Sequence, residues 1–556
     1  MTGLQEGGAR GDGDAGAAIA IGGQATGGLR SLPFARDVQG TGVTAEPADS
    51  MGGILPDWLA RRADVSRNRL ALVAPGTRWT FADLDAAAEQ AAGWLAGRGI
   101  GPNDRVATLL RNGAWPVVVL HGLIRLGAVL VPLNTRLTIP ELVWQLTNCG
   151  ARFLIADEPN AEKATTAAST VSGVAGIFVP PLAAGSSGGL EVRAQARAEP
   201  RQVDLQALHS IVYTSGTTGR PKGAMLTLGN HCWNAIGSAL YLGLRPDDRL
   251  LASLPLFHVG GMAILFRSVI YGAAAVVQET FDPHAMNAAI DDEGVTIVSV
   301  VAAMLQRMLD DRGSRSYPLS LRCVLLGGGP APRPLLEDCE RRGMPVVQTY
   351  GLTETASQAV TLAPEDALRK LGSAGTPLLP LELRISVNGR TAATGEVGEI
   401  LVKGPSVSPG YWGMGGSNRD AEDWLHTGDA GWLDTEGYLY VADRRDDLIV
   451  SGGENVYPAE VEAALLAHPA VEEAGVVGVP DPRWGQVPVA VVKLRAGARS
   501  SEEDLIQFCA NRLARYKAPS RVGFLPSLPR NAAGKLLRRE LRDSELVRGW
   551  VGSNTS

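Results

Sequence analysis

The stretch Tyr213–Ala224 reads YTSGTTGRPKGA and lies between two apolar segments. It combines hydroxyl side chains, glycines and two basic residues. This composition suits contact with phosphate, because glycine lets backbone N–H groups approach an oxygen closely. The spacing is not G-x-x-x-x-G-K-[ST], so the stretch is not the nucleotide loop of that pattern. It predicts a phosphate-binding loop of another kind.

The segments around this loop alternate between strand and helix patterns. The apolar run DRVATLL at 104–110 is followed by a helical segment and by GAVLVPLN at 127–134. Similar strand patterns recur at 151–157, 272–279, 296–301 and 321–329. Strand–helix–strand repeats are typical of a parallel α/β sheet. We therefore predict the α/β fold class, with a large N-terminal domain of parallel-sheet α/β units.

The pattern changes after about residue 380. LELRISVNG, GEILVKG and GYLYVAD alternate as antiparallel hairpins do, which predicts a β-rich subdomain. A shorter unit with two helices and two strands begins at about Asp446 and predicts a small α+β domain. The expected division is a glycine-rich, disordered leader at 1–50, an N-terminal domain at 51–445 and a mobile C-terminal domain at 446–550. An overlong gene start, with Met51 as the first residue, is the alternative for the leader.

Composition excludes several classes of protein. The net charge of -6 gives no reason to expect nucleic acid or an anionic membrane as a partner. The five cysteines are scattered and include no CxxC pair, so neither a disulfide framework nor a zinc site is expected, and a reducing cytoplasm fits. The apolar segment Trp115–Leu133 contains His121 and Arg125 and is broken by glycines, so we predict a buried helix and strand, not a membrane span.

Further loops carry groups suited to chemistry, although each alone is a weak signal. They are LPLFHVGGM at 254–262, LLGGGPAP at 325–332, QTYGLTETAS at 348–357, WLHTGDAGWLD at 424–434, DRRDDLIVSGGENVYPAEVE at 443–462 and PRNAAGKLLRREL at 529–541. Their order and spacing, together with the opening loop, resemble the adenylate-forming superfamily of acyl-CoA synthetases, peptide-synthetase adenylation domains and luciferases. The resemblance runs from about Leu55 to Arg542.

The resemblance implies ATP, Mg²⁺ and CoA as cofactor and co-substrates, and it assigns a role to each loop. The ATP phosphates are expected at Thr214, Ser215, Gly216, Thr217, Thr218, Gly219 and Lys222, with Gly328, Gly329 and Gly351 also in the nucleotide site. Tyr350 is expected to stack on adenine, Asp429 to bind the ribose with Arg444 nearby, and Glu354 to hold Mg²⁺ with Thr353. Lys535 is expected to reach the reacting oxygens, His258 to line the acyl site, the Gly452–Gly453 turn to face the thiol tunnel, and Asp446 to act as the hinge.

Several longer stretches, including SLRCVLLGGGPAPRPLLE and DPRWGQVPVA, resemble the o-succinylbenzoate–CoA ligases of menaquinone biosynthesis. This predicts an aromatic carboxylic acid as the substrate. Arg267 falls on a predicted helix with Gly260 and Gly261, and is the expected partner of the ring carboxylate, with Ser373 as a second donor. Another aryl- or medium-chain acyl-CoA synthetase and a standalone adenylation domain loading a carrier protein stay open, as does a homo-oligomeric state.

Overall fold

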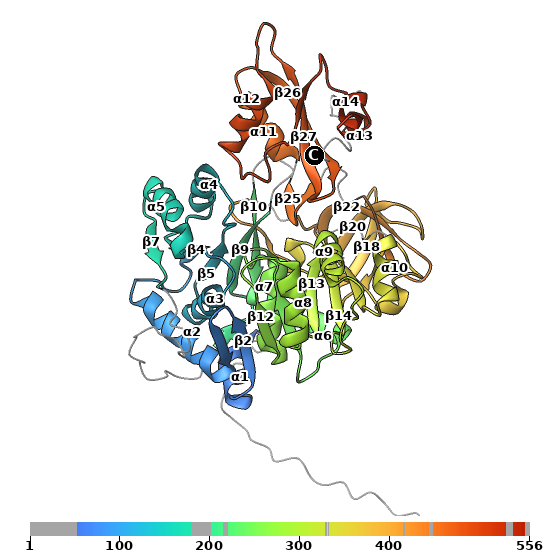
Figure 1. Cartoon of the computed structure of the whole chain (residues 1–556). Helices are drawn as coiled ribbons and strands as arrows, with labels where there is room; N and C mark the ends of the chain where they lie inside the picture. Colours follow the sequence, from blue (N-terminus) through green and yellow to red (C-terminus); the bar gives the residue numbers. More distant parts are fainter. Residues whose placement is uncertain are drawn as a thin grey trace, which may run out of the picture. The chain divides into compact units, whose positions relative to one another are not determined.

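The computed structural model describes residues 53–180, 202–214, 221–328, 331, 333–414, 418–443, 449–456, 458–529 and 538–550, and all statements below concern these ranges. Within them, the chain forms two large sheets and a separate small one (Figure 1). A short antiparallel pair, β1 (Ile54–Pro56) with β8 (Gln202–Asp204), lies outside these sheets.

The first large sheet contains the strands on either side of the glycine-rich loop. Its order is β21 (Gly410–Tyr411), β10 (Lys222–Thr227), β9 (Leu208–Thr214), β5 (Val129–Pro132), β4 (Arg105–Leu109), β6 (Phe153–Ala156) and β7 (Ala175–Phe178). The strands from β9 to β7 run parallel, and β10 turns back antiparallel on β9. The glycine-rich stretch of the sequence therefore falls between the end of β9 at Thr214 and the start of β10 at Lys222.

The second large sheet joins a parallel part to an antiparallel part. The parallel strands are β2 (Leu70–Ala74), β12 (Ala274–Val277), β11 (Arg249–Ala252), β13 (Ile297–Val301), β14 (Cys323–Gly327) and β15 (Val346–Tyr350), and β3 (Thr77–Thr80) pairs antiparallel with β2. The antiparallel part continues through β16 (Val360–Leu362), β17 (Ser373–Pro377), β23 (Leu439–Asp443), β22 (Leu425–Leu433), β20 (Gly398–Lys403), β18 (Glu382–Val387) and β19 (Arg390–Thr391). Both predicted regions, parallel and then hairpin-rich, are confirmed.

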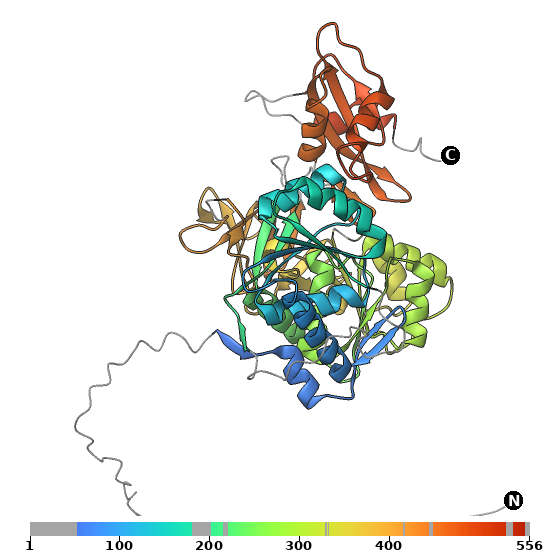
Figure 2. The ribbon, with the colours of Figure 1, turned by 90° about the vertical axis from the view of Figure 1, so that its left-hand side faces the viewer.

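Helices cover both faces of the parallel strands. The inner layer packs between the two large sheets and consists of α1 (Trp58–Val65), α2 (Phe81–Ala96), α3 (Ala114–Leu126), α6 (Leu228–Leu242) and α7 (Val259–Tyr271). The outer faces carry α4 (Ile139–Cys149) and α5 (Ala161–Thr170) on the first sheet, and α8 (Pro283–Asp292), α9 (Ala302–Arg312) and α10 (Arg333–Arg341) on the second. Figure 2 shows the two outer helix groups on different sides of the body. The strands are therefore buried on both faces, which explains their continuous apolar runs.

The small sheet is built after residue 448. It contains β24 (Ile449–Ser451), β25 (Glu454–Val456), β26 (Val471–Asp481), β27 (Gly485–Leu494) and β28 (Val522–Phe524). Four helices accompany it, namely α11 (Pro458–Leu466), α12 (Glu502–Ala510), α13 (Arg538–Arg542) and α14 (Glu545–Arg548). It has apolar clusters of its own, so the predicted α+β unit is confirmed as a fold. The predicted boundary at 445/446 lies outside the described residues.

The apolar segment 115–133 forms most of α3 and the strand β5, both buried, as the sequence predicts. Among the helices that the structure describes, none is long and apolar enough to cross a membrane. All five cysteines are buried and free of disulfides.

Candidate active site

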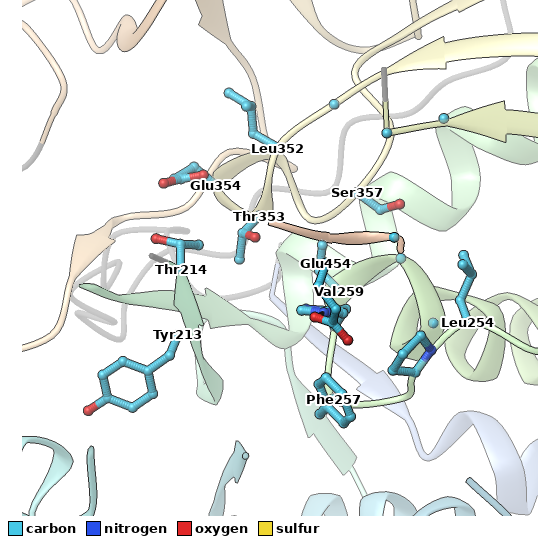
Figure 3. Close-up of a pocket in the computed structure, with 18 of the residues that line it drawn as sticks. Tyr213, Thr214, Leu254, Phe257, Val259, Leu352, Thr353, Glu354, Ser357 and Glu454 are labelled. Carbon is cyan, nitrogen blue, oxygen red and sulfur yellow. Dashed lines mark hydrogen bonds and ion pairs between the residues drawn. The ribbon is translucent and has the colours of Figure 1, made fainter. Parts of the chain in front are cut away.

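A cavity of about 320 Å³ opens at the carboxyl ends of the central parallel strands of the second sheet. Val301 at the end of β13, Gly328 after β14 and Gly351 after β15 all line it. Open α/β sheets bind ligands in crevices at this edge. β9, with Tyr213 and Thr214, faces the same space from the first sheet (Figure 3). The cavity is therefore shared by the two large sheets.

Most of the predicted site residues that the structure describes line this cavity. They are Thr214, Lys222, His258, Gly260, Gly261, Arg267, Gly328, Gly351, Thr353, Glu354, Asp429 and Gly453. The predicted residues that do not line it are Tyr350, Ser373 and Gly452. The predicted loop residues Ser215, Gly216, Thr217, Thr218 and Gly219, together with Gly329, Arg444, Asp446 and Lys535, lie outside the described ranges.

Tyr350 lies behind the cavity wall and contacts Asp429, which lines the cavity. Its side chain is buried, and its hydroxyl donates to the Asp429 carboxylate at 2.8 Å. The contact fixes the orientation of a carboxylate that does line the cavity. In this structure Tyr350 acts on the site through Asp429, and its predicted stacking on adenine stays a prediction.

The turn after β15 has a tightly constrained backbone. A Cβ atom on Gly351 would lie 1.7 Å from the Ser357 carbonyl oxygen, so only glycine fits there. Ala356 and Ser357 have φ values of 55° and 113°, a region that costs non-glycine residues about 1–3 kcal/mol each. The Thr355 hydroxyl accepts from the backbone N–H of Leu352 at 3.0 Å and closes the turn. The surrounding contacts must hold this strain.

The same turn presents Thr353 and Glu354 to the cavity, close to Thr214 (Figure 3). The Glu354 carboxylate accepts a hydrogen bond from the Tyr411 hydroxyl, and its backbone carbonyl accepts from the Ser408 N–H at 2.7 Å. Mg²⁺ in phosphoryl-transfer sites is bound by one or two carboxylates plus phosphates. A fixed carboxylate in a cavity that Thr214 and Lys222 also line fits that requirement. Within the described ranges no cluster of three or more metal-ligating side chains occurs.

His258 caps α7 and meets a carboxylate from the small sheet. Its Nε2 lies 2.8 Å from Oε2 of Glu454, which is only 2% exposed. Glu454 also accepts from Arg136 at 2.8 Å. Burial raises the pKa of Glu454, but the attraction of His258 and Arg136 is larger in sum and holds it below its usual range. Glu454 is therefore a fixed negative charge at the cavity wall.

Arg267 is a buried basic residue of the cavity wall. α7 carries it into the cavity, it is 3% exposed, and burial lowers the pKa of its guanidinium. Its Nη2 donates to Oδ1 of Asn234 at 2.8 Å, while its Nε has no partner. Among the residues that the structure describes, no carboxylate pairs with it. Arg267 is therefore not part of a surface ion pair within the described ranges.

The two glycines before Arg267 have different structural functions. A Cβ atom on Gly261 would lie 2.3 Å from the Pro255 carbonyl oxygen, so this glycine is needed to pack α7 on the preceding loop. A Cβ atom on Gly260 would only touch Leu254 at 3.8 Å. Gly260 leaves room in the cavity, whereas Gly261 is primarily a packing requirement.

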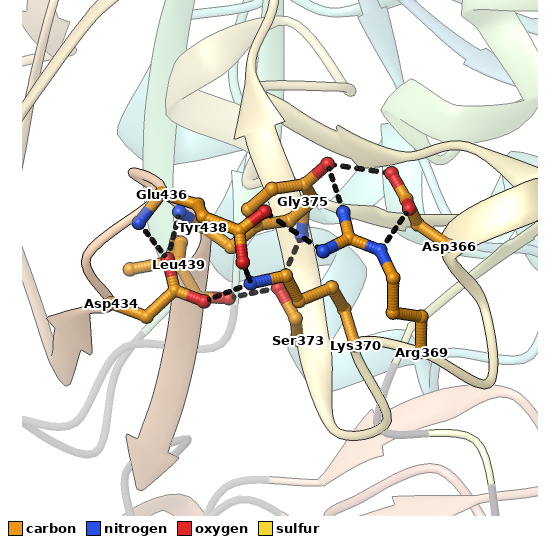
Figure 4. A network of polar contacts seen from close by, with 9 residues as sticks. All are labelled: Asp366, Arg369, Lys370, Ser373, Gly375, Asp434, Glu436, Tyr438 and Leu439. Atoms are coloured by element: carbon orange, nitrogen blue, oxygen red, sulfur yellow. Dashed lines mark hydrogen bonds and ion pairs between the residues drawn. The ribbon is translucent and has the colours of Figure 1, made fainter.

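Ser373 lies away from the cavity, in contrast to its predicted position. Its hydroxyl donates to the Leu439 carbonyl at 2.8 Å and accepts from the Gly375 N–H at 3.0 Å, which joins β17 to β23 (Figure 4). Lys370, in the same network, donates to Asp434 at 2.7 Å. The hydroxyl is engaged in sheet structure, so this geometry does not support Ser373 as a substrate donor.

The two glycines of the turn between β24 and β25 also differ in function. Gly453 lines the cavity, whereas Gly452 packs against Trp484, whose ring would lie 2.7 Å from an added Cβ. Both glycines have positive φ, at 58° and 84°. The turn is thus placed to bring Gly453 and Glu454 to the cavity wall.

Sequence reasoning missed four residues that the geometry brings to the site. Glu454 and Tyr411 line the cavity, and Arg136 and Asn234 hold Glu454 and Arg267. Glu454 stands in the quoted GGENVYP segment, where a charged residue beside two glycines was a usable signal. The other three carry no signal in the sequence, because their contacts join segments far apart in the chain.

Comparisons with known proteins identify the family of this chain. Residues 59–412 match the AMP-binding enzyme family and residues 460–535 match the AMP-binding enzyme C-terminal domain. A 2-succinylbenzoate–CoA ligase of Geobacillus kaustophilus is 52% identical over 88% of this chain and 97% of its own, and one of Bacillus cytotoxicus is 46% identical over 88% and 98%.

Two solved structures of the o-succinylbenzoate CoA synthetase of Bacillus subtilis, each 43% identical, cover 88% of this chain and 99% of their own. A double mutant with its product analogue OSB-NCoA gives a TM-score of 0.81, and the complex with the acyl-adenylate intermediate OSB-AMP gives 0.67. At equal identity and coverage, the present structure is thus closer to the product-analogue complex. The chain belongs to the AMP-binding enzyme family, among relatives that are 2-succinylbenzoate–CoA ligases.

Proposed function

We propose that this chain is an ATP-dependent acid–CoA ligase that activates o-succinylbenzoate as an acyl adenylate, releases pyrophosphate, and transfers the acyl group to CoA. One observation carries the choice of acid. Arg267 places a buried cation in the cavity, with no carboxylate partner among the described residues. The same cavity is lined by the turn 351–358 after β15, which we call the nucleotide turn. The named relatives act on the acid that would complete this pair.

The chemistry requires two steps because a carboxylate has no good leaving group. Attack of a carboxylate oxygen on the α-phosphorus of ATP breaks the bond to pyrophosphate and makes AMP the new leaving group. A thiol then displaces AMP and forms the thioester. The first step spreads charge over phosphoryl oxygens, so catalysis is mainly positioning and electrostatic stabilisation.

The nucleotide side is assigned to fixed groups of this chain. The loop that includes Ser215–Gly219 and ends at Lys222 would bind the phosphates, and Asp429, oriented by Tyr350, would accept from the ribose hydroxyls. Mg²⁺, held by Glu354 with Thr353, supplies positive charge that neutralises phosphate oxygens when bound. Lys535 would place a cation on the reacting oxygens during adenylation.

The thiol side is assigned to the turn that contains Gly453 and Glu454. Gly453, Glu454 and His258 line the cavity, and Glu454 contacts His258 in the present structure, which resembles the product-analogue complex. We propose that 51–445 and 446–550 are separate domains and that Asp446 is the hinge between them. A swing of the smaller domain would exchange Lys535 for the glycine turn at the cavity between the two steps.

The acid would lie with one carboxylate at the α-phosphate and its ring carboxylate at Arg267. A buried carboxylate without a partner is costly, and a guanidinium offers two parallel donors to it. Gly260, where an added Cβ would meet only Leu254 at 3.8 Å, leaves space for the acid in the cavity. The distance between the nucleotide turn and Arg267 would then select acids with two carboxylates over benzoate or octanoate.

The other reactions left open by the sequence are not favoured by the comparisons, because the relatives with high identity are CoA ligases for this acid. We place the enzyme in menaquinone biosynthesis and in the cytoplasm, where free thiols and CoA coexist. Buried, unpaired cysteines support this location.

The test is a panel of acids in a pyrophosphate-release assay with ATP and CoA. o-Succinylbenzoate should give the highest kcat/KM, above benzoate, octanoate and 4-oxo-4-phenylbutanoate, which lacks the ring carboxylate. Preference for any of these three would reject the proposal. A second arm replaces CoA by a carrier protein bearing phosphopantetheine, and faster transfer to the carrier would reassign the acceptor.

A further inference from the structure

Asn234 on α6 does not line the cavity but contacts two parts of its wall. Its side-chain nitrogen donates to the carbonyl oxygens of Thr355 at 3.1 Å and of Gln358 at 2.8 Å. Its side-chain oxygen accepts from Arg267 at 2.8 Å. The residue is 4% exposed, so water does not compete for these contacts. One buried amide therefore touches both the nucleotide turn and the acyl-end arginine.

The orientation of this amide is fixed by its neighbours. Both backbone partners are carbonyl oxygens and can only accept, so the NH₂ group must face them. The guanidinium of Arg267 can only donate, so the amide oxygen must face it. Rotation of the amide by 180° would place donors together and acceptors together. Among uncharged side chains, only asparagine and the longer glutamine offer two donors on one side and an acceptor on the other.

The contacts lie where each partner needs support. The two carbonyls flank Ala356 and Ser357, whose positive φ values store strain in the turn that presents Glu354. Among the described residues, the guanidinium of Arg267 forms this hydrogen bond, and its Nε has no partner. Loss of the amide would release the strained turn and leave the arginine without a fixed direction.

We propose that Asn234 is a positioning residue that joins the acid end of the cavity to the nucleotide turn, orienting Arg267 through its oxygen and the turn of Thr353 and Glu354 through its nitrogen. The inference rests on the proposed function, because it takes Arg267 as the partner of the ring carboxylate. Asn234 then supports the binding of both ligands, the acid through Arg267 and ATP through the turn.

The experiment compares Asn234→Ala and Asn234→Asp with the unchanged enzyme, using KM for o-succinylbenzoate, KM for ATP, kcat and the unfolding midpoint. Asn287→Ala is the matched control, because Asn287 is equally buried and donates to the Met308 carbonyl at 2.9 Å, away from the cavity. A hydrogen bond to a charged group is worth about 1.5–3 kcal/mol, so Asn234→Ala should raise KM for the acid about tenfold or more.

Asn234→Asp separates positioning from packing. The aspartate keeps the shape, but its charge would pair with Arg267 and compete with the ring carboxylate. We expect acid affinity to fall in the order Asn, Ala, Asp, and KM for ATP to rise in both variants. A purely structural asparagine would instead make the isosteric Asp variant the milder one. Asn287→Ala should lower the unfolding midpoint and leave both KM values unchanged.

A double-mutant cycle provides the final arm. In an Arg267→Ala background, Asn234→Ala should no longer change KM for the acid, while its effect on KM for ATP should persist. An unchanged acid effect in that background, or variants that change only kcat and the unfolding midpoint, would overturn the proposal. Failure of the proposed function would show separately, as equal use of 4-oxo-4-phenylbutanoate by the unchanged enzyme.

Discussion

Arg267→Met is the substitution that tests the acid site most directly. It keeps the length and apolar body of the side chain on α7 and removes only the guanidinium. Arg267 is 3% exposed, and its guanidinium donates a hydrogen bond to Asn234. The substitution should stabilise the free enzyme against unfolding and weaken acid binding. The buried charge costs desolvation in the free enzyme, whereas it pairs with the ring carboxylate in the acid complex.

The magnitudes follow from burial. Removing one partner from a buried ion pair costs about 3–5 kcal/mol, so KM for o-succinylbenzoate should rise by about two to four orders of magnitude. In the free enzyme the guanidinium costs several kcal/mol of desolvation, whereas its loss leaves one buried acceptor on Asn234 that costs about 1–3 kcal/mol. The unfolding midpoint of the variant should therefore not fall, and should rise by about 1–3 °C.

The assay combines steady-state pyrophosphate release with thermal unfolding in the presence and absence of the acid. KM for ATP should stay near its original value, and 4-oxo-4-phenylbutanoate should be used equally by both proteins. Saturating o-succinylbenzoate should stabilise the unchanged enzyme and not the variant at the same concentration. A variant that melts lower and binds the acid as before would show that Arg267 is a structural residue and refute the reasoning.

Three further substitutions test other parts of the molecule. Glu454→Gln removes the negative charge that faces His258, so thioester formation should slow about tenfold while acid-dependent pyrophosphate exchange continues; equal losses would contradict a function in the second step. Lys535→Ala should slow adenylation and spare transfer from preformed acyl adenylate, and a matching loss in both would remove it from the first step. Burial lowers the pKa of His121 to about 4 and of His209 to about 3, so the unfolded chain binds more protons below pH 6.5 and stability falls from there towards pH 4, by about 1.4 kcal/mol per pH unit for each ring. His209→Met should reduce the slope of unfolding free energy against pH by the contribution of one bound proton. An unchanged slope would exclude His209 as a source of this pH dependence.

The fold was accessible from the sequence because each layer leaves a local pattern. Strands buried on both faces, such as β6 and β12, read as unbroken apolar runs, and β18, in which Ile385 alone is buried, alternates polar and apolar residues. The glycine-rich motifs then located the cavity, because the ends of neighbouring parallel strands meet at one edge.

The rest depended on contacts between distant segments. His258 and Glu454 are 196 residues apart, and nothing local pairs them. Ser373 is part of a loop-like sequence of small residues, yet it begins β17, and pairing with β23 turns its hydroxyl towards Leu439. Arg267 was placed correctly on a helix, but its contact with Asn234 needed the packing of α6 against α7.

The burial of every cysteine has a consequence for an enzyme whose product is a thioester. Burial raises the pKa of Cys149 and Cys232 to about 11 and of the remaining three to about 12. Only the thiolate attacks an activated acyl group or a disulfide, and these groups are almost entirely protonated near neutral pH. The protein thus offers the acyl adenylate no thiol of its own that could trap it. Self-acylation and mixed disulfides with oxidised CoA are suppressed by the same packing that forms the core.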